Sequence, residues 1–131
     1  MPDLRTIDCE ENASFFRKLN FIQEETNALK IRLGELVREI TSKRDLFEAE
    51  NLQNRLLRLD EFISTTRYYL YDFRKKFCEK DINSTGLESR KRLMQLQDAM
   101  GSVESWFTRL KKDLSEFAGR CTESEQDRQP G

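Results

Sequence analysis

Residues 49–77 read AENLQNRLLRLDEFISTTRYYLYDFRKKF, and this stretch carries an unbroken 3,4 repeat of apolar and small residues. Helical residues three and four apart lie on one face, so the repeat predicts a single long helix with one apolar seam. The seam consists of Ala49, Leu52, Leu56, Leu59, Ile63, Thr66, Leu70, Phe73 and Phe77. A seam of this length has to be buried against other helices.

Two further stretches carry the same repeat. The first seam runs through Phe15, Leu19, Ile22, Thr26, Leu29, Leu33, Leu36 and Ile40. The third runs through Leu93, Leu96, Met100, Val103, Phe107, Leu110, Leu114, Phe117 and Cys121. Because three seams bury one another most readily, we expect an all-α, elongated antiparallel three-helix coiled-coil bundle with helices over about 8–40, 45–80 and 86–118. A long hairpin of the first two helices, with the third beside a second subunit, is the alternative.

The start of the first helix and the first turn have separate signals. Asp8 with Glu11 three residues later resembles a capping box, which predicts a helix start at Asp8. Ser42 with Asp45 is a second cap pair. The apolar repeat also changes phase across residues 41–44, so a turn is expected there.

The second turn is marked by the turn-forming residues 81–86, DINSTG. Thr85 with Glu88 then gives a capping box for the third helix. Gly119 is expected to terminate that helix after Ala118. The sequence therefore predicts one helical domain up to residue 119.

Length and charge limit the class of protein. The chain has 131 residues, and its 23 basic and 24 acidic side chains give a net charge of −1. This balance argues against a general nucleic-acid binder or a polybasic membrane anchor. No apolar run is long enough to span a membrane, and the N-terminus lacks the apolar region of a signal peptide. We expect a soluble cytoplasmic protein whose polar tail, residues 120–131, is disordered.

Residue types for catalysis are scarce. The chain contains no histidine, which removes Ser-His-Asp and Cys-His nucleophile systems. Its five glycines are isolated and form no phosphate-binding loop. No acidic residue occupies a position of the three seams as quoted, so no buried carboxylate pair is expected. The sequence predicts neither an enzyme nor a metal or cofactor site.

Two threonines interrupt otherwise apolar seams. Each hydroxyl of Thr26 and Thr66 is expected to bond back to the carbonyl one turn earlier. If the first turn lies near residue 43, residue numbers adding to about 86 lie level in the first two helices. Thr26 then faces residue 60 rather than Thr66, so the two do not form a polar pocket.

The cysteines Cys9, Cys78 and Cys121 are odd in number and have no CxxC spacing. This pattern favours free thiols in a reducing compartment over a disulfide framework or a zinc site. The rule that residue numbers adding to about 86 lie level places Cys9 and Cys78 at the same end of the bundle. A redox-linked pair is therefore the alternative.

Aromatic residues outside the seams are candidates for an interface. Tyr68 and Tyr71 lie three positions apart, and both fall off the seam of the second helix. Phe21 falls off the seam of the first helix. Exposed aromatic side chains are enriched at protein interfaces. The alternative is that these residues widen the buried stripe.

Basic residues gather on both sides of the second turn. The candidate anion-binding residues are Arg74, Lys75, Lys76, Arg90, Lys91 and Arg92. Three acidic residues interrupt the group: Glu79, Asp81 and Glu88. Cations at a helix C-terminus also suit the helix dipole, so a solvated helix end is the favoured interpretation.

Two segments, 27–37 (NALKIRLGELV) and 48–56 (EAENLQNRL), with the third helix that reaches Phe117, resemble small uncharacterised bacterial coiled-coil and helical-bundle proteins. The resemblance rests on residues typical of coiled coils and covers most of the helical part. It implies a bacterial, cytoplasmic helical bundle and brings no activity or site residues.

These observations favour a non-enzymatic helical-bundle protein that acts through protein–protein interaction or self-association. The partner would be another protein or a second copy in a homodimer, with no membrane and no cofactor. The alternative is anion or nucleic-acid binding through the basic turn between the second and third helices, which the balanced charge disfavours.

Overall fold

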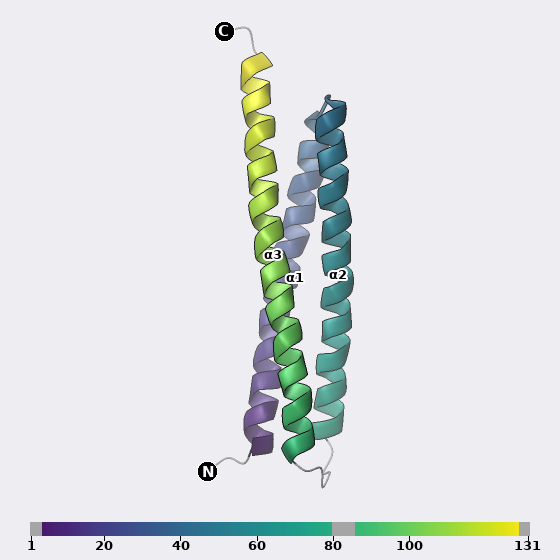
Figure 1. The fold of residues 1–131 in the computed structure, drawn as a ribbon, viewed down its shortest axis with the longest axis vertical. Coiled ribbons are helices and arrows are strands. Elements are labelled where there is room, and N and C mark those ends of the chain that lie inside the picture. The colour runs from purple at the N-terminus through teal and green to yellow at the C-terminus, as the bar shows by residue number, and fades with distance from the viewer. Residues whose placement is uncertain (1–3, 80–85, 129–131) are drawn as a thin grey trace.

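The computed structural model describes residues 4–79 and 86–128, and it is a long three-helix bundle (Figure 1). Helix α1 spans Leu4–Glu39, α2 spans Lys43–Phe77 and α3 spans Gly86–Arg128. The helices run up, down and up, and each packs against both others. The described residues contain no strand. The expected all-α bundle is confirmed, and α3 packs within the same chain rather than leaving a hairpin of α1 and α2.

The core is built from the three seams. Every residue of the α2 seam is buried, and the remaining seam residues are buried or half-buried. The side chains with no more than 1% exposure include Leu19, Leu56, Leu59, Ile63, Leu70, Leu93, Val103, Leu110, Leu114 and Phe117. Burying one such apolar side chain contributes about 1.5–3 kcal/mol. The 3,4 repeat therefore identifies the residues that hold the bundle together.

The start of α1 and the end of α3 differ from the prediction. Helix α1 begins at Leu4, so Asp8 lies inside the helix and is not its N-cap. Helix α3 continues through Gly119 to Arg128, so the predicted end at Ala118 is wrong and residues 120–128 of the expected tail are helical. Gly119 does not have the positive φ of a terminating glycine, since no described glycine has one. In Figure 1 the last turns of α3 extend past the α1–α2 turn.

The first turn follows the sequence signal. Ser42 has extended backbone angles (φ −80°, ψ 134°), and its hydroxyl oxygen accepts a hydrogen bond from the Asp45 amide at 3.4 Å. The predicted cap pair is confirmed. Helix α2 ends at Phe77 rather than near residue 80. The predicted turn at residues 81–85, with its Thr85 cap, lies outside the described residues.

The register between α1 and α2 is also as expected. The Gln23 amide donates to Asp60 at 3.2 Å, and the Lys30 ammonium forms an ion pair with the same carboxylate. Residue 60 therefore lies level with Thr26. The Thr26 hydroxyl donates to the Ile22 carbonyl at 2.7 Å, and the Thr66 hydroxyl donates to the Phe62 carbonyl at 2.8 Å. Each threonine hydroxyl therefore finds its hydrogen-bond acceptor within its own helix.

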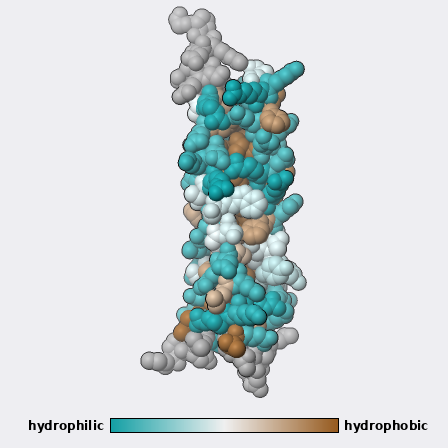
Figure 2. Space-filling model, viewed as in Figure 1, coloured by the Kyte–Doolittle hydropathy of each residue, from teal (hydrophilic) through white to brown (hydrophobic). Residues whose placement is uncertain are grey.

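The face of the bundle shown in Figure 2 is mostly hydrophilic. Figure 2 shows one face of the bundle, on which hydrophobic side chains are scattered among hydrophilic ones. Among the described residues, none of the helices combines the length and the apolar character needed to cross a membrane.

Candidate functional site

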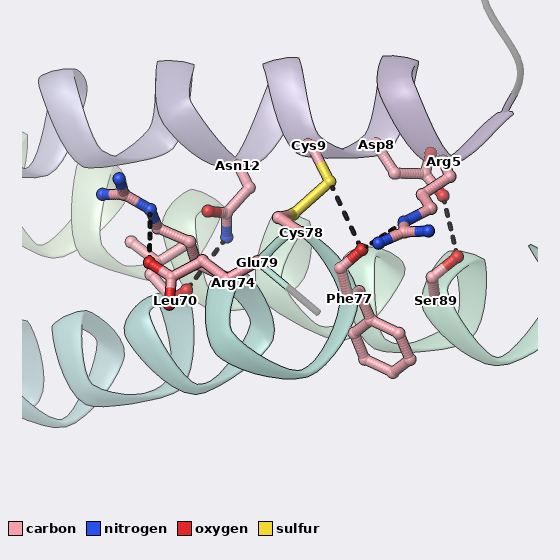
Figure 3. Close-up of a disulfide and its surroundings, with 10 residues drawn as sticks. All are labelled: Arg5, Asp8, Cys9, Asn12, Leu70, Arg74, Phe77, Cys78, Glu79 and Ser89. Carbon is pink, nitrogen blue, oxygen red and sulfur yellow. Dashed lines mark hydrogen bonds and ion pairs between the residues drawn. A yellow bond between two sulfur atoms is a disulfide. The ribbon is translucent and has the colours of Figure 1, made fainter. Parts of the chain in front are cut away.

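A disulfide joins Cys9 of α1 to Cys78, the C-cap residue of α2, with their Cα atoms 6.0 Å apart (Figure 3). The expectation of free thiols is therefore wrong for this pair, and Cys121 takes no part in it. The rule for level residues in the first two helices correctly placed the two cysteines together. We call this part of the bundle the disulfide end, and the part around Ser42 the turn end.

The C-terminus of α2 is held by more than the disulfide. The Arg5 Nε donates a hydrogen bond of 2.6 Å to the Phe77 carbonyl (Figure 3). The last carbonyls of a helix have no partner within the helix and carry partial negative charge, so an arginine stabilises them. The Cys9 sulfur lies 3.8 Å from the same oxygen. In the disulfide this sulfur has no proton to donate, so the second contact is only van der Waals.

Polar residues replace apolar ones in the seams at the disulfide end. Asp8, Asn12 and Ser89 are at most 2% exposed. The Ser89 hydroxyl donates to Asp8 Oδ2 at 3.2 Å, and the Arg90 guanidinium lies 3.3 Å from Asp8 Oδ1 (ion-pair distance, without hydrogen-bond geometry). The Asn12 amide donates to the Leu70 carbonyl at 3.2 Å. These contacts tie α1 to both other helices.

The expectation that no acidic residue lies in a seam is wrong for Asp8, which is buried. Counting back from Leu19 and Phe15, the 3,4 spacing reaches Asn12 and then Asp8. The 3,4 spacing of the α1 seam therefore continues to Asp8, although the residues there are polar. This spacing could have identified Asp8 as a seam residue rather than a cap. The neighbouring Glu11, assigned to the same cap, has a buried Oε2 without a hydrogen-bond partner in the described part of the chain.

The structure decides between the two interpretations of the candidate interface residues, because all three are exposed. Tyr68 is 65% exposed, Tyr71 48% and Phe21 59%. The ring of Tyr68 meets that of Tyr69 edge to face, with centroids 5.6 Å apart. The ammonium of Lys75 lies 4.8 Å from the centre of the Tyr71 ring. Phe21 lies on α1, whereas the tyrosines lie on α2.

The candidate anion-binding residues are divided by the structure. Arg74 pairs with Glu79 at 3.4 Å, Lys76 with Asp72 at 3.1 Å and Arg90 with Asp8 at 3.3 Å. Lys75 lies over the Tyr71 ring. Within residues 4–79 and 86–128, no ion pair engages Lys91 or Arg92. Three of the six candidate residues are therefore already paired with an acidic side chain.

A groove of about 410 Å³ lies between α2 and α3, near the disulfide end. We call it the α2–α3 groove. Its lining includes Tyr69, Phe73, Phe77, Arg92, Leu96 and Ala99. Its volume falls within the range of about 300–1,000 Å³ that is usual for small-molecule sites. The seam patterns did not indicate it.

Comparisons with known proteins do not extend this description: no protein family, curated protein or solved structure matches the chain. Among the described residues, no group of three or more histidine, cysteine, aspartate or glutamate side chains is placed to hold a metal ion. Functional proposals therefore rest on the exposed tyrosines, the disulfide end and the α2–α3 groove.

Proposed function

We propose that this bundle is a non-enzymatic protein that acts through protein–protein contact, with the tyrosine surface of α2 as the interface. That surface consists of Tyr68, Tyr69 and Tyr71. One observation carries the proposal: three large aromatic side chains, each 48–65% exposed, lie within four residues on a helix whose seam is fully buried. Tyrosine is enriched at interfaces because it offers a large area at low entropic cost.

A second copy of the chain is the partner that the charges favour. A net charge of −1 produces little repulsion between copies. The tyrosine surface is bordered by Lys75, whose ammonium already lies over the Tyr71 ring and limits the motion of that ring. A partly ordered aromatic surface loses less entropy on association.

Sedimentation velocity over a range of concentrations tests this proposal. The wild-type chain is expected to dimerise, and the double variant Tyr68→Ser/Tyr71→Ser is expected to remain monomeric. The matched control is Phe47→Ser, because Phe47 is equally exposed (65%) on the same helix but lies near the turn end. Phe21→Ser tests whether the candidate interface residue of α1 contributes to dimerisation. A wild-type chain that stays monomeric, or a double variant that dimerises like wild type, contradicts the proposal.

The second candidate function is anion or nucleic-acid binding by the basic residues at the end of α2 and the start of α3. It is supported by Lys91 and Arg92, which take part in no ion pair within the described residues. Phosphate contacts release counterions, so two such contacts give a slope of log K against log salt of about −2. An affinity that does not fall as salt is added removes this candidate.

The compartment is a further part of the proposal. Disulfides persist in oxidising compartments and are rare in the cytosol. The Cys9–Cys78 bond therefore weighs against the cytoplasmic location expected from sequence. Acid quenching of cells followed by thiol alkylation measures which form is present. A fully alkylated pair would restore the cytoplasmic interpretation.

A further inference from the structure

The boundary between α2 and α3 repeats every seven residues. Arg55 of α2 pairs with Asp113 of α3 at 2.7 Å. Seven residues further along α2 and seven back along α3, the rings of Phe62 and Trp106 meet with centroids 5.8 Å apart. Antiparallel helices keep such pairs level over several heptads. The next level is therefore Tyr69 opposite Ala99.

The level of Tyr69 and Ala99 lacks a ring on the α3 side. Phe62 and Trp106 are both half-buried and fill the boundary at their own level. At the next level α3 offers only the methyl group of Ala99, and Tyr69 is 51% exposed. Both residues line the α2–α3 groove. The groove thus occupies the place where the preceding heptad puts an aromatic side chain.

The floor of the groove is apolar and well anchored. Phe73, Phe77 and Leu96 line it and are only 3–6% exposed. The rings of Phe73 and Phe77 pack against each other with centroids 5.0 Å apart. The backbone of Phe77 is fixed by the Arg5 hydrogen bond and by the adjacent disulfide at Cys78. Preformed sites of this kind bind without a large cost in ordering.

One end of the groove carries a positive charge, that of Arg92, which no described acidic residue pairs with. The following level brings Lys76 opposite Arg92, and the Lys76 ammonium is already paired with Asp72. Asp72 also lines the groove, so its charge and that of Lys76 cancel. Arg92 has no ion pair with any described residue. A guanidinium binds a carboxylate with two parallel hydrogen bonds.

We propose that the α2–α3 groove binds a small carboxylic acid with an aromatic body. The ring of the ligand would lie against Tyr69 over Ala99, where the heptad pattern leaves room for one. Its carboxylate would accept hydrogen bonds from the Arg92 guanidinium. The groove shares Tyr69 with the proposed protein interface but not Tyr68 or Tyr71. Tyr68→Ser/Tyr71→Ser should therefore prevent dimerisation without changing ligand binding.

An NMR titration with 3-phenylpropionate tests the assignment, and its neutral analogue 3-phenylpropanamide serves as the comparison. The acid is expected to bind saturably, with shifts centred on Tyr69, Arg92 and Ala99. The amide is expected to bind at least about tenfold more weakly, because it carries no negative charge and offers the guanidinium one acceptor oxygen in place of two. The absence of saturable binding by the acid, or equal binding of acid and amide, overturns the proposal.

Two variants locate the site. Arg92→Gln should weaken the acid about tenfold, whereas Lys91→Gln, the matched change at the neighbouring cation, should leave its affinity unchanged. Ala99→Phe should abolish binding, because its ring recreates the filled level of Phe62 and Trp106. The thermal melt of each variant checks that it is folded. Equal effects of Arg92→Gln and Lys91→Gln, or full binding by a folded Ala99→Phe, contradict the site.

A last comparison separates a free acid from a peptide terminus of the same chemistry. The dipeptide glycyl-phenylalanine presents a ring and a carboxylate on a peptide backbone. It is expected to bind no more tightly than 3-phenylpropionate. Markedly tighter binding of the dipeptide overturns the free-acid assignment in favour of a peptide carboxyl terminus.

Discussion

The two ends of the bundle close the same three seams by different means. At the disulfide end, Cys9 and Cys78 are bonded and a buried Asp8 meets Ser89 and Arg90. At the turn end, the Ser42 hydroxyl caps α2. There the ion pairs between Glu48 and the arginines Arg44 and Arg120 are exposed. The buried polar groups of the disulfide end have partners only in the folded chain. At the turn end, water can replace the partner of an exposed group.

This difference shows where the stability of the helix ends lies. A buried polar group that loses its partner costs about 1–3 kcal/mol, because water cannot reach it. An exposed ion pair contributes about 0–1 kcal/mol, because water solvates either charge alone. Substitutions at the disulfide end should therefore destabilise the bundle more than substitutions at the turn end.

The largest effect is expected from opening the disulfide. The bond closes a loop with a sequence separation of 69 residues. In the chain-entropy account, a loop of this length stabilises the fold by about 4 kcal/mol. Adding dithiothreitol, or the double change Cys9→Ser/Cys78→Ser, should lower the free energy of unfolding in urea by about that amount.

The internal control for this experiment is the double variant itself, whose unfolding should not respond to dithiothreitol. Cys121→Ser should respond to dithiothreitol as wild type does, because Cys121 is outside the disulfide. If the reductant leaves wild-type unfolding unchanged, the disulfide does not stabilise this end.

The next effect is expected at Asp8, which is 0% exposed. Asp8→Ala removes the buried carboxylate that accepts from the Ser89 hydroxyl and pairs with Arg90. The Arg90 side chain is 42% exposed and can turn to solvent, so the cost should be about 2 kcal/mol rather than that of a fully buried pair. Asp8→Asn keeps an acceptor for Ser89 and should cost less. Urea unfolding of the two variants measures this order, and a reversed order would contradict the assigned contacts.

At the turn end, Ser42→Ala should cost about 1 kcal/mol, the usual value for loss of an N-cap. The cap oxygen accepts from the Asp45 amide, so that amide should lose protection from hydrogen exchange. Ser42→Asp, which keeps an acceptor, serves as the control and should retain protection. Equal exchange in wild type and Ser42→Ala would show that the cap contributes nothing.

The smallest effect is expected from Glu48→Gln, about 0.5 kcal/mol or less. The Glu48 carboxylate accepts a 2.7 Å hydrogen bond from Arg120, and this bond raises the pKa of Arg120 above its ordinary value. A raised arginine pKa gives stability that is fully present below the unfolded value. Its contribution is therefore constant around neutral pH. Thermal melts of the variant and wild type should nearly coincide, and a loss as large as that of Asp8→Ala would refute the comparison.

Much of the fold follows from spacing within single helices. The α2 seam is buried along its whole length, and the Ser42 cap and the level of residue 60 lie where the pattern predicts. Asp8 shows the limit of this reasoning. Its spacing assigns it to the seam, whereas its residue type and Glu11 assign it to a cap. The structure follows the spacing, because Ser89 and Arg90 of a distant segment supply its partners.

The candidate sites were less predictable, because they depend on more than one helix. Tyr68 and Tyr71 are exposed since their own helix turns them from the seam. The α2–α3 groove instead depends on which α3 residue lies opposite Tyr69. That information is in the register between two helices, and no spacing within one helix contains it.

The Cys9–Cys78 bond also determines how the molecule carries mechanical load. Tension applied between the two termini passes from residue 9 directly to residue 78 through the sulfur atoms. The α1–α2 hairpin between them is then shielded from stretching, and only α3 and the short ends of the chain can extend. In a single-molecule pulling record, a reducing buffer should therefore release an additional length of chain that an oxidising buffer keeps hidden.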